Sequence, residues 1–125
     1  MSQLQNTLTP RHQKMIELLV VFPPFVWLML SASFYAGGEY FSKFWAINPT
    51  VGTSVQVVMC YSFAALTWLP ALLHKNEITI MGASWLLLAT LVTVFIGCFV
   101  FNENLTFSHW LGLGLACTAS VLLSS

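Results

Sequence analysis

The sequence predicts an all-α membrane protein with four transmembrane helices joined by short loops. Its 125 residues are 58% hydrophobic and only 6% charged, whereas a soluble domain carries about a quarter charged residues. The stretch from Gly82 to Phe101 holds 20 residues without a charge. As a helix this stretch would be about 30 Å long, which matches the hydrocarbon core of a bilayer. A second apolar run follows it after the short polar segment NENLTFSH.

The N-terminal part of the chain contains a polar segment and then a long apolar run. Residues 1–14 lack the apolar core and the cleavage site of a signal peptide, so we expect a retained tail. The apolar run over residues 16–45 is too long for one perpendicular span, and Pro23–Pro24 interrupts it. We favour an interfacial or kinked lead-in over residues 15–22 and a first span over residues 24–44. The alternative is one long tilted helix with a proline kink.

Three further spans follow in the same single domain, residues 15–125. Pro49 suits the start of the second span, and Thr106 suits the N-cap of the fourth. The three spans are predicted over residues 51–73, 80–101 and 106–123.

The distribution of basic residues predicts that both termini are cytoplasmic. Arg11, Lys14 and Lys75 fall on one side of the predicted spans, and Lys43 alone falls toward the other. Tryptophans commonly anchor helices at membrane interfaces. The five tryptophans agree with this topology: Trp27, Trp68 and Trp85 fall near one interface, and Trp45 and Trp110 near the other.

The composition argues against several functional classes. The net charge is zero, so no basic field is present to bind nucleic acid. Cys60, Cys98 and Cys117 all fall in apolar runs without metal-ligand spacing, and we interpret them as small packing residues. No nucleophile–base pair or phosphate loop is present. We therefore expect neither an enzyme nor a metal or other cofactor.

Small residues recur every four positions in the last two predicted spans. Ala89, Thr93 and Gly97 do so in the third, and Gly112, Ala116 and Ser120 in the fourth. Such stripes let helices approach closely in lipid, where hydrophobicity does not drive helices together. Packing within one chain is the simpler interpretation. The alternative is a dimer seam on the fourth span, and we expect a homo- or hetero-dimer because four short helices enclose little volume.

Glu39 and Lys43 are the ionisable residues expected within the membrane. They lie four apart in the order that favours an ion pair on a helix, and a charge in the bilayer needs a partner, water or a shallow position. They form either a proton, cation or headgroup site, or an ion pair at the end of the helix. Glu103, in the hinge after the third span and near His109, is either a gate or a solvated carboxylate.

Several segments together resemble the drug/metabolite transporter superfamily in its four-helix form. This group includes the small multidrug resistance transporters and the small flippase subunits that move lipid-linked aminoarabinose. The resemblance covers residues 25–125. Its carriers are Gly38-Glu39-Tyr40-Phe41-Ser42-Lys43, Pro49-Thr50-Val51-Gly52-Thr53, Trp85, Phe101-Asn102-Glu103-Asn104-Leu105-Thr106 and Gly112-Leu113-Gly114.

One departure from the family pattern concerns the intramembrane glutamate of the multidrug exporters. If Lys43 matches the lysine that ends the first helix in those proteins, the glutamate position falls at Tyr35. Glu39 then lies one turn nearer the helix end. This pattern resembles the flippase-type branch more than the proton-coupled drug exporters. The resemblance implies a bacterial inner-membrane location.

Two functions fit these observations. The first is a small transporter or flippase subunit that works as a dimer by alternating access on an amphiphilic, lipid-linked or small organic solute. Its pathway would be lined by Tyr35, Glu39, Lys43 and Trp85, with Glu103 at the hinge. The second is a non-transporting accessory subunit of a larger membrane complex.

Overall fold

The computed structural model describes residues 9–75 and 77–124, and within them it contains helices and short connections but no strand. This confirms the predicted all-α class. The helices are α2 (Pro10–Val20), α3 (Pro24–Ile47), α4 (Val51–Lys75), α5 (Ile78–Phe95), the π-helical turn η1 (Ile96–Val100) that continues α5, and α6 (Phe107–Ser124).

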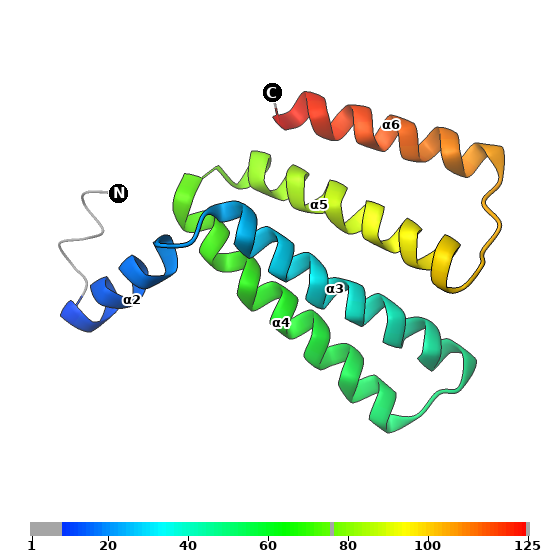
Figure 1. The fold of residues 1–125 in the computed structure, drawn as a ribbon, viewed down its shortest axis with the longest axis horizontal. Helices are drawn as coiled ribbons and strands as arrows, with labels where there is room; N and C mark the ends of the chain where they lie inside the picture. Colours follow the sequence, from blue (N-terminus) through cyan, green and yellow to red (C-terminus); the bar gives the residue numbers. More distant parts are fainter. Residues whose placement is uncertain (1–8, 76, 125) are drawn as a thin grey trace.

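Helices α3, α4 and α5 pack against one another, and α6 lies along the outer side of α5 (Figure 1). The α3–α4 pair makes the most extensive contact. Thr50 begins α4 because its hydroxyl accepts a hydrogen bond from the backbone N–H of Thr53 at 3.3 Å and its carbonyl accepts one from Ser54 at 3.1 Å. Residues 48–50 therefore form a tight turn, so α3 and α4 run antiparallel.

Small side chains hold α3 against α4. Ser31, Ala32 and Gly38 are the buried residues of α3. On α4, Ala64 and Ala71 are buried, and the hydroxyl of Ser31 donates to the carbonyl of Ala64 at 2.7 Å. Close backbone approach with an interhelical hydrogen bond is the packing mode that helices use in lipid.

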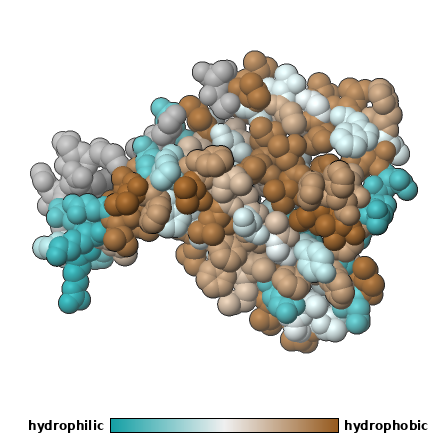
Figure 2. All heavy atoms as spheres, in the orientation of Figure 1, coloured by the Kyte–Doolittle hydropathy of each residue, from teal (hydrophilic) through white to brown (hydrophobic). Residues whose placement is uncertain are grey.

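The outer surface of the helices is largely apolar. Large exposed hydrophobic side chains occur on every helix from α2 to α6. Figure 2 shows one face on which brown, hydrophobic atoms cover most of the surface, with teal, hydrophilic atoms gathered at the α2 end and the opposite end. A water-soluble monomer rarely exposes so much contiguous apolar area, so this surface suits contact with lipid.

The lengths of the helices support an all-α membrane protein without establishing the predicted count of four spans. Val51–His74 and Ile78–Val100 are each long and apolar enough to cross a membrane. The pair α2 and α3 meets the same requirement only when taken together, and the two helices are bent by 84°. Residues 107–123 of α6 form a shorter apolar helix. Length and composition thus give two or three spans.

The bend between α2 and α3 favours the predicted separate lead-in over one long tilted helix. Helix α2 begins at Pro10, inside the segment expected to be a polar tail, and ends before Pro23–Pro24. The indole N–H of Trp27 in α3 donates to the carbonyl of Leu19 at 3.0 Å. This bond satisfies one carbonyl that the end of α2 leaves free.

Gly38 provides a direct test of the α3–α4 packing. A Cβ atom at this position would lie 2.6 Å from the Tyr61 ring, whereas one at Gly52 would meet no atom within 4 Å. We expect Gly38→Ala to lower the free energy of unfolding by about 1–3 kcal/mol through overpacking. Gly52→Ala should leave it unchanged or raise it by up to about 1 kcal/mol. Unfolding in mixed detergent micelles measures both, and equal stability of the two variants would contradict the packing.

Candidate functional site

An aromatic cavity of about 310 Å³ lies between α3, α4 and α5. The centroid of the Tyr35 ring lies 5.6 Å from that of Tyr61 and 5.4 Å from that of Trp85, and the Trp68 centroid lies 6.3 Å from Trp85. Its lining residues are Tyr35, Tyr61, Ala64, Ala65, Trp68 and Trp85. The structure therefore brings together two of the predicted pathway residues, Tyr35 and Trp85, in one apolar wall.

A short hydrogen-bond chain fixes the ring of Trp85. Its indole N–H donates to the hydroxyl of Ser31 at 2.9 Å, and Ser31 donates in turn to the carbonyl of Ala64. Ser31 is fully buried, and its hydroxyl connects α3 to both α4 and α5 through these two hydrogen bonds. This contact orients Trp85 across the cavity.

Trp68 is a site residue that the sequence interpretation missed, because it was assigned to a membrane interface. Its indole nitrogen is buried and has no hydrogen-bond partner among the described residues. Tyr61 and Trp68 are seven residues apart on α4, which places them on the same helical face, with Ala64 between them. The seven-residue spacing from Tyr61 could therefore have identified Trp68 as a site residue from the sequence.

Glu39 lies on α3, one turn after Tyr35. Its carboxylate accepts a hydrogen bond from the Tyr61 hydroxyl at 3.0 Å. The same hydroxyl lies 3.3 Å from that of Ser42. Tyr61 thus contacts the aromatic cavity with its ring and the carboxylate with its oxygen.

A smaller polar cavity of about 80 Å³ adjoins Glu39. It also contains two residues of the third-span stripe, Thr93 and Gly97, whereas Ala89 of that stripe is buried within the chain. The lining residues are Glu39, Lys43, Thr93, Ile96, Gly97, Phe101 and Glu103. Three of the predicted functional residues, Glu39, Lys43 and Glu103, therefore share one cavity.

Of the two alternatives for Glu39 and Lys43, the structure does not form the ion pair between them: Lys43 forms its ion pair with Glu103. Lys43 also lies over the ring of Phe101, with Nζ 5.9 Å from the centroid. The two paired side chains are 43% and 44% exposed, which suits the outer end of the helices. A long lysine side chain extends outward toward water in this way. The Glu39 carboxylate therefore accepts its hydrogen bond from the Tyr61 hydroxyl and not from Lys43.

The backbone of the α5–α6 hinge brings Glu103 to Lys43. Asn102 has a φ of 52°, in the left-handed region that asparagine tolerates better than most residues. The chain consequently turns back, and the N–H of Glu103 donates to the carbonyl of Gly97 at 2.9 Å. A Cβ atom on Gly97 would lie 3.0 Å from the Glu103 carboxylate, so glycine leaves room for this contact.

The predicted dimer seam lies on the outermost helix. Gly112 and Ala116 are exposed and Ser120 is half-buried. Gly112 and Ala116 also border a groove of about 380 Å³ between α6 and α5. A Cβ atom at Gly112 would meet no atom within 4 Å. The stripe is thus accessible within a single chain, and a seam there stays a prediction.

The chemistry of this arrangement is that of non-covalent binding. Aromatic faces attract organic cations, with an interaction that strengthens when water is excluded, and Glu39 supplies a carboxylate at the edge of the aromatic wall. Among residues 9–75 and 77–124, no group of three or more His, Cys, Asp or Glu side chains could hold a metal ion.

Comparison with known proteins identifies a relative of similar length. The quaternary ammonium compound-resistance protein QacG of Staphylococcus sp. (strain ST94) is 31% identical over 96 residues, which are 77% of this chain and 82% of that protein. No family model and no solved structure matches the chain. The similarity extends over most of both proteins, and it agrees with the apolar helices described above. The chain therefore belongs to the small multidrug resistance family of membrane transporters.

Proposed function

We propose that this protein moves small amphiphilic organic cations across the bilayer, and that quaternary ammonium compounds are the substrate class. The observation that carries the proposal is the aromatic cavity beside Glu39, linked to that carboxylate through Tyr61. The name of the relative, a quaternary ammonium compound-resistance protein, points to the same class. A quaternary ammonium ion has no N–H group, so ring faces and a nearby negative charge are what can recognise it.

The charge balance of the site favours a cation over a lipid-linked sugar phosphate. Within the described part of the chain, no cation pairs with Glu39, because Lys43 is engaged by Glu103. An anionic phosphate would meet the carboxylate and the negative faces of the aromatic rings, whereas a cation is attracted by both. We therefore favour drug-type export over flippase-type transport for this chain.

Glu39 is proposed to take the role that the family resemblance assigns to the position of Tyr35. A carboxylate within the membrane is costly unless it has a partner. The Tyr61 hydroxyl supplies one hydrogen bond, and a bound cation would supply a compensating charge. Release of the cation then requires a proton or another cation at Glu39, which is the basis of alternating access in this proposal.

We further propose that α3, α4, α5 and α6 all cross the membrane and that two chains form the transporter. Helix α6 contacts α5 at the edge of the chain, and 18 residues of helix reach about 27 Å, close to the hydrocarbon thickness. The small residues Gly112 and Ala116 remain accessible for a second copy. A second chain would also enlarge the enclosed volume around the substrate.

Replacing the carboxylate tests the proposed substrate site. In proteoliposomes, we expect Glu39→Gln to lower uptake of tetrapropylammonium by about tenfold to a hundredfold, because a hydrogen bond or contact to a charged group contributes about 1.5–3 kcal/mol. Glu77→Gln is the matched control, since Glu77 is exposed and lies outside both cavities. Wild-type uptake by Glu39→Gln, or an equal loss in both variants, would contradict the proposal.

Two glycines on α6 test the proposed seam. A Cβ atom at either Gly112 or Gly114 would meet no atom of the same chain within 4 Å, but only Gly112 belongs to the stripe. We expect Gly112→Leu to raise the dimer dissociation constant about 5-fold to 150-fold through overpacking of 1–3 kcal/mol, and Gly114→Leu to change it little. Single-molecule photobleaching in dilute vesicles measures the dimer fraction. Equal dimer fractions in the two variants would exclude this seam.

A further inference from the structure

Helix α2 carries an exposed apolar face that nothing in the described chain covers. Met15 and Leu18 in α2 are 55% and 69% exposed, and Phe22, two residues after the end of α2, is 53% exposed. At 100° per residue Met15 and Leu18 fall on one side of the helix. Ile16 and Leu19 are half-buried, and α2 contacts α4. The apolar surface of α2 is therefore wider than its contact with the bundle requires.

Basic residues border this exposed face. Arg11, in the first turn, lies on the same side of the helix as Met15 and Leu18, toward its N-terminal end. Lys14, in the next turn, lies at the edge of this side, and both basic side chains are exposed. Gln13 and Glu17 lie close together on the other side of the helix. A helix with an apolar face bordered by Arg and Lys is typical of segments that lie in the headgroup region of a membrane.

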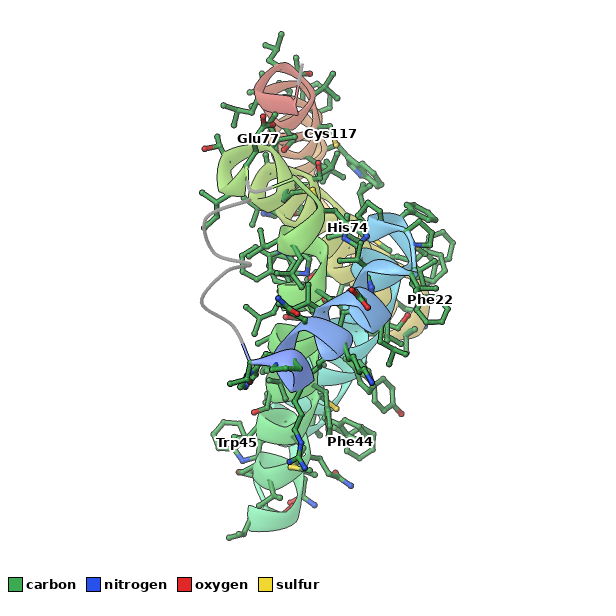
Figure 3. The ribbon with its side chains drawn as sticks, turned by 90° about the vertical axis from the view of Figure 1, so that its left-hand side faces the viewer. Phe22, Phe44, Trp45, His74, Glu77 and Cys117 are labelled. Carbon is green, nitrogen blue, oxygen red and sulfur yellow. The ribbon has the colours of Figure 1, made fainter. Side chains whose placement is uncertain are left out.

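The orientation of α2 agrees with a position along the membrane surface. It is bent by 84° from α3, so it lies nearly parallel to the bilayer when α3 crosses it. Eleven residues reach only about 16 Å, which is too short to span. Figure 3, viewed from the α2 end, shows α2 lying across the bundle with Phe22 directed outward.

Two side chains from the bundle hold α2 in this orientation. Trp27 donates to the carbonyl of Leu19. His74, near the end of α4, places Nε2 3.3 Å from the carbonyl of Val20 and Nδ1 3.2 Å from that of Pro70. The C-terminal end of α2 is thus attached to both α3 and α4, which fixes its direction relative to the predicted spans.

We propose that α2 is a membrane-surface helix that binds anionic lipid headgroups. Met15, Leu18 and Phe22 insert among the upper acyl chains, while Arg11 and Lys14 contact lipid phosphates. The same end of the molecule carries the α4–α5 connection and the end of α6 (Figure 1). This is the side predicted to face the cytoplasm, whose leaflet carries anionic lipids. The function proposed above does not require this surface.

Single-cysteine labelling of the full chain tests the proposal. Cys60, Cys98 and Cys117 are replaced by alanine, and an environment-sensitive fluorophore is attached to Leu18→Cys or Gln13→Cys. The protein is reconstituted in vesicles of phosphatidylcholine alone or of phosphatidylcholine with phosphatidylglycerol. We expect the Leu18 label to be shielded from aqueous acrylamide and quenched by lipid-borne nitroxide. The Gln13 label should remain accessible to acrylamide.

The double variant Arg11→Gln/Lys14→Gln separates lipid charge from apolar insertion. Each basic side chain near an anionic surface strengthens binding about fivefold. The extra shielding that phosphatidylglycerol gives to the Leu18 label should therefore disappear in this variant. An unchanged thermal unfolding midpoint of the reconstituted protein shows that the bundle is intact.

Two results would overturn the proposal. One is a Leu18 label as accessible to acrylamide as the Gln13 label in vesicles with phosphatidylglycerol. The other is a Leu18 label whose shielding decreases when the protein is diluted in lipid and is the same with and without phosphatidylglycerol. A second copy of the chain would then be what covers α2.

Discussion

The ion pair between Lys43 and Glu103 determines the electrostatics of the whole site. Glu39 is one turn away from Lys43 on α3, and an ion pair between them was one of the two alternatives from the sequence, but the α5–α6 hinge brings Glu103 to the lysine instead. Because the positive charge is engaged at the outer end of the helices, Glu39 has the Tyr61 hydroxyl as its partner. A carboxylate that has no fixed cationic partner can attract a bound cation.

The position of Tyr61 depends in turn on the packing of α3 against α4. Gly38 leaves the space in which the Tyr61 ring lies. Ser31, two turns earlier on α3, ties this helix to Ala64 and to Trp85. The same close approach that stabilises the helix pair therefore places the aromatic rings and the carboxylate side by side. Stability and recognition share these contacts, so substitutions at Gly38 or Ser31 should affect both.

Local sequence features predicted much of the fold. Apolar length indicated helices at each expected span, and Pro23–Pro24 and Pro49 marked where the chain turns. The number of spans was harder to predict than the positions of the helices. The charges and serines of α3 lower its hydropathy, and α6 is short. The start of α2 at Pro10 was missed because polar residues occupy its first turn.

The candidate site was predicted only in part, for a different reason. Spacing along one helix identifies neighbours on that helix, which is why Glu39 and Lys43 were paired. Spacing along one helix cannot show that Asn102 adopts a left-handed conformation, which turns the chain back so that Glu103 reaches Lys43. Trp68 was likewise assigned to an interface, since its contact with Trp85 depends on how α4 and α5 pack.

A double-mutant cycle tests this account most directly. The free energy of unfolding in mixed micelles is measured for Lys43→Met, Glu103→Gln and their combination, and in parallel for Lys43→Met with Glu39→Gln. The account predicts a coupling energy of about 0.5–1 kcal/mol between Lys43 and Glu103 and almost none between Lys43 and Glu39. A coupling energy between Lys43 and Glu39 that exceeds the one between Lys43 and Glu103 would contradict the account. Lys43 would then be the cationic partner of Glu39.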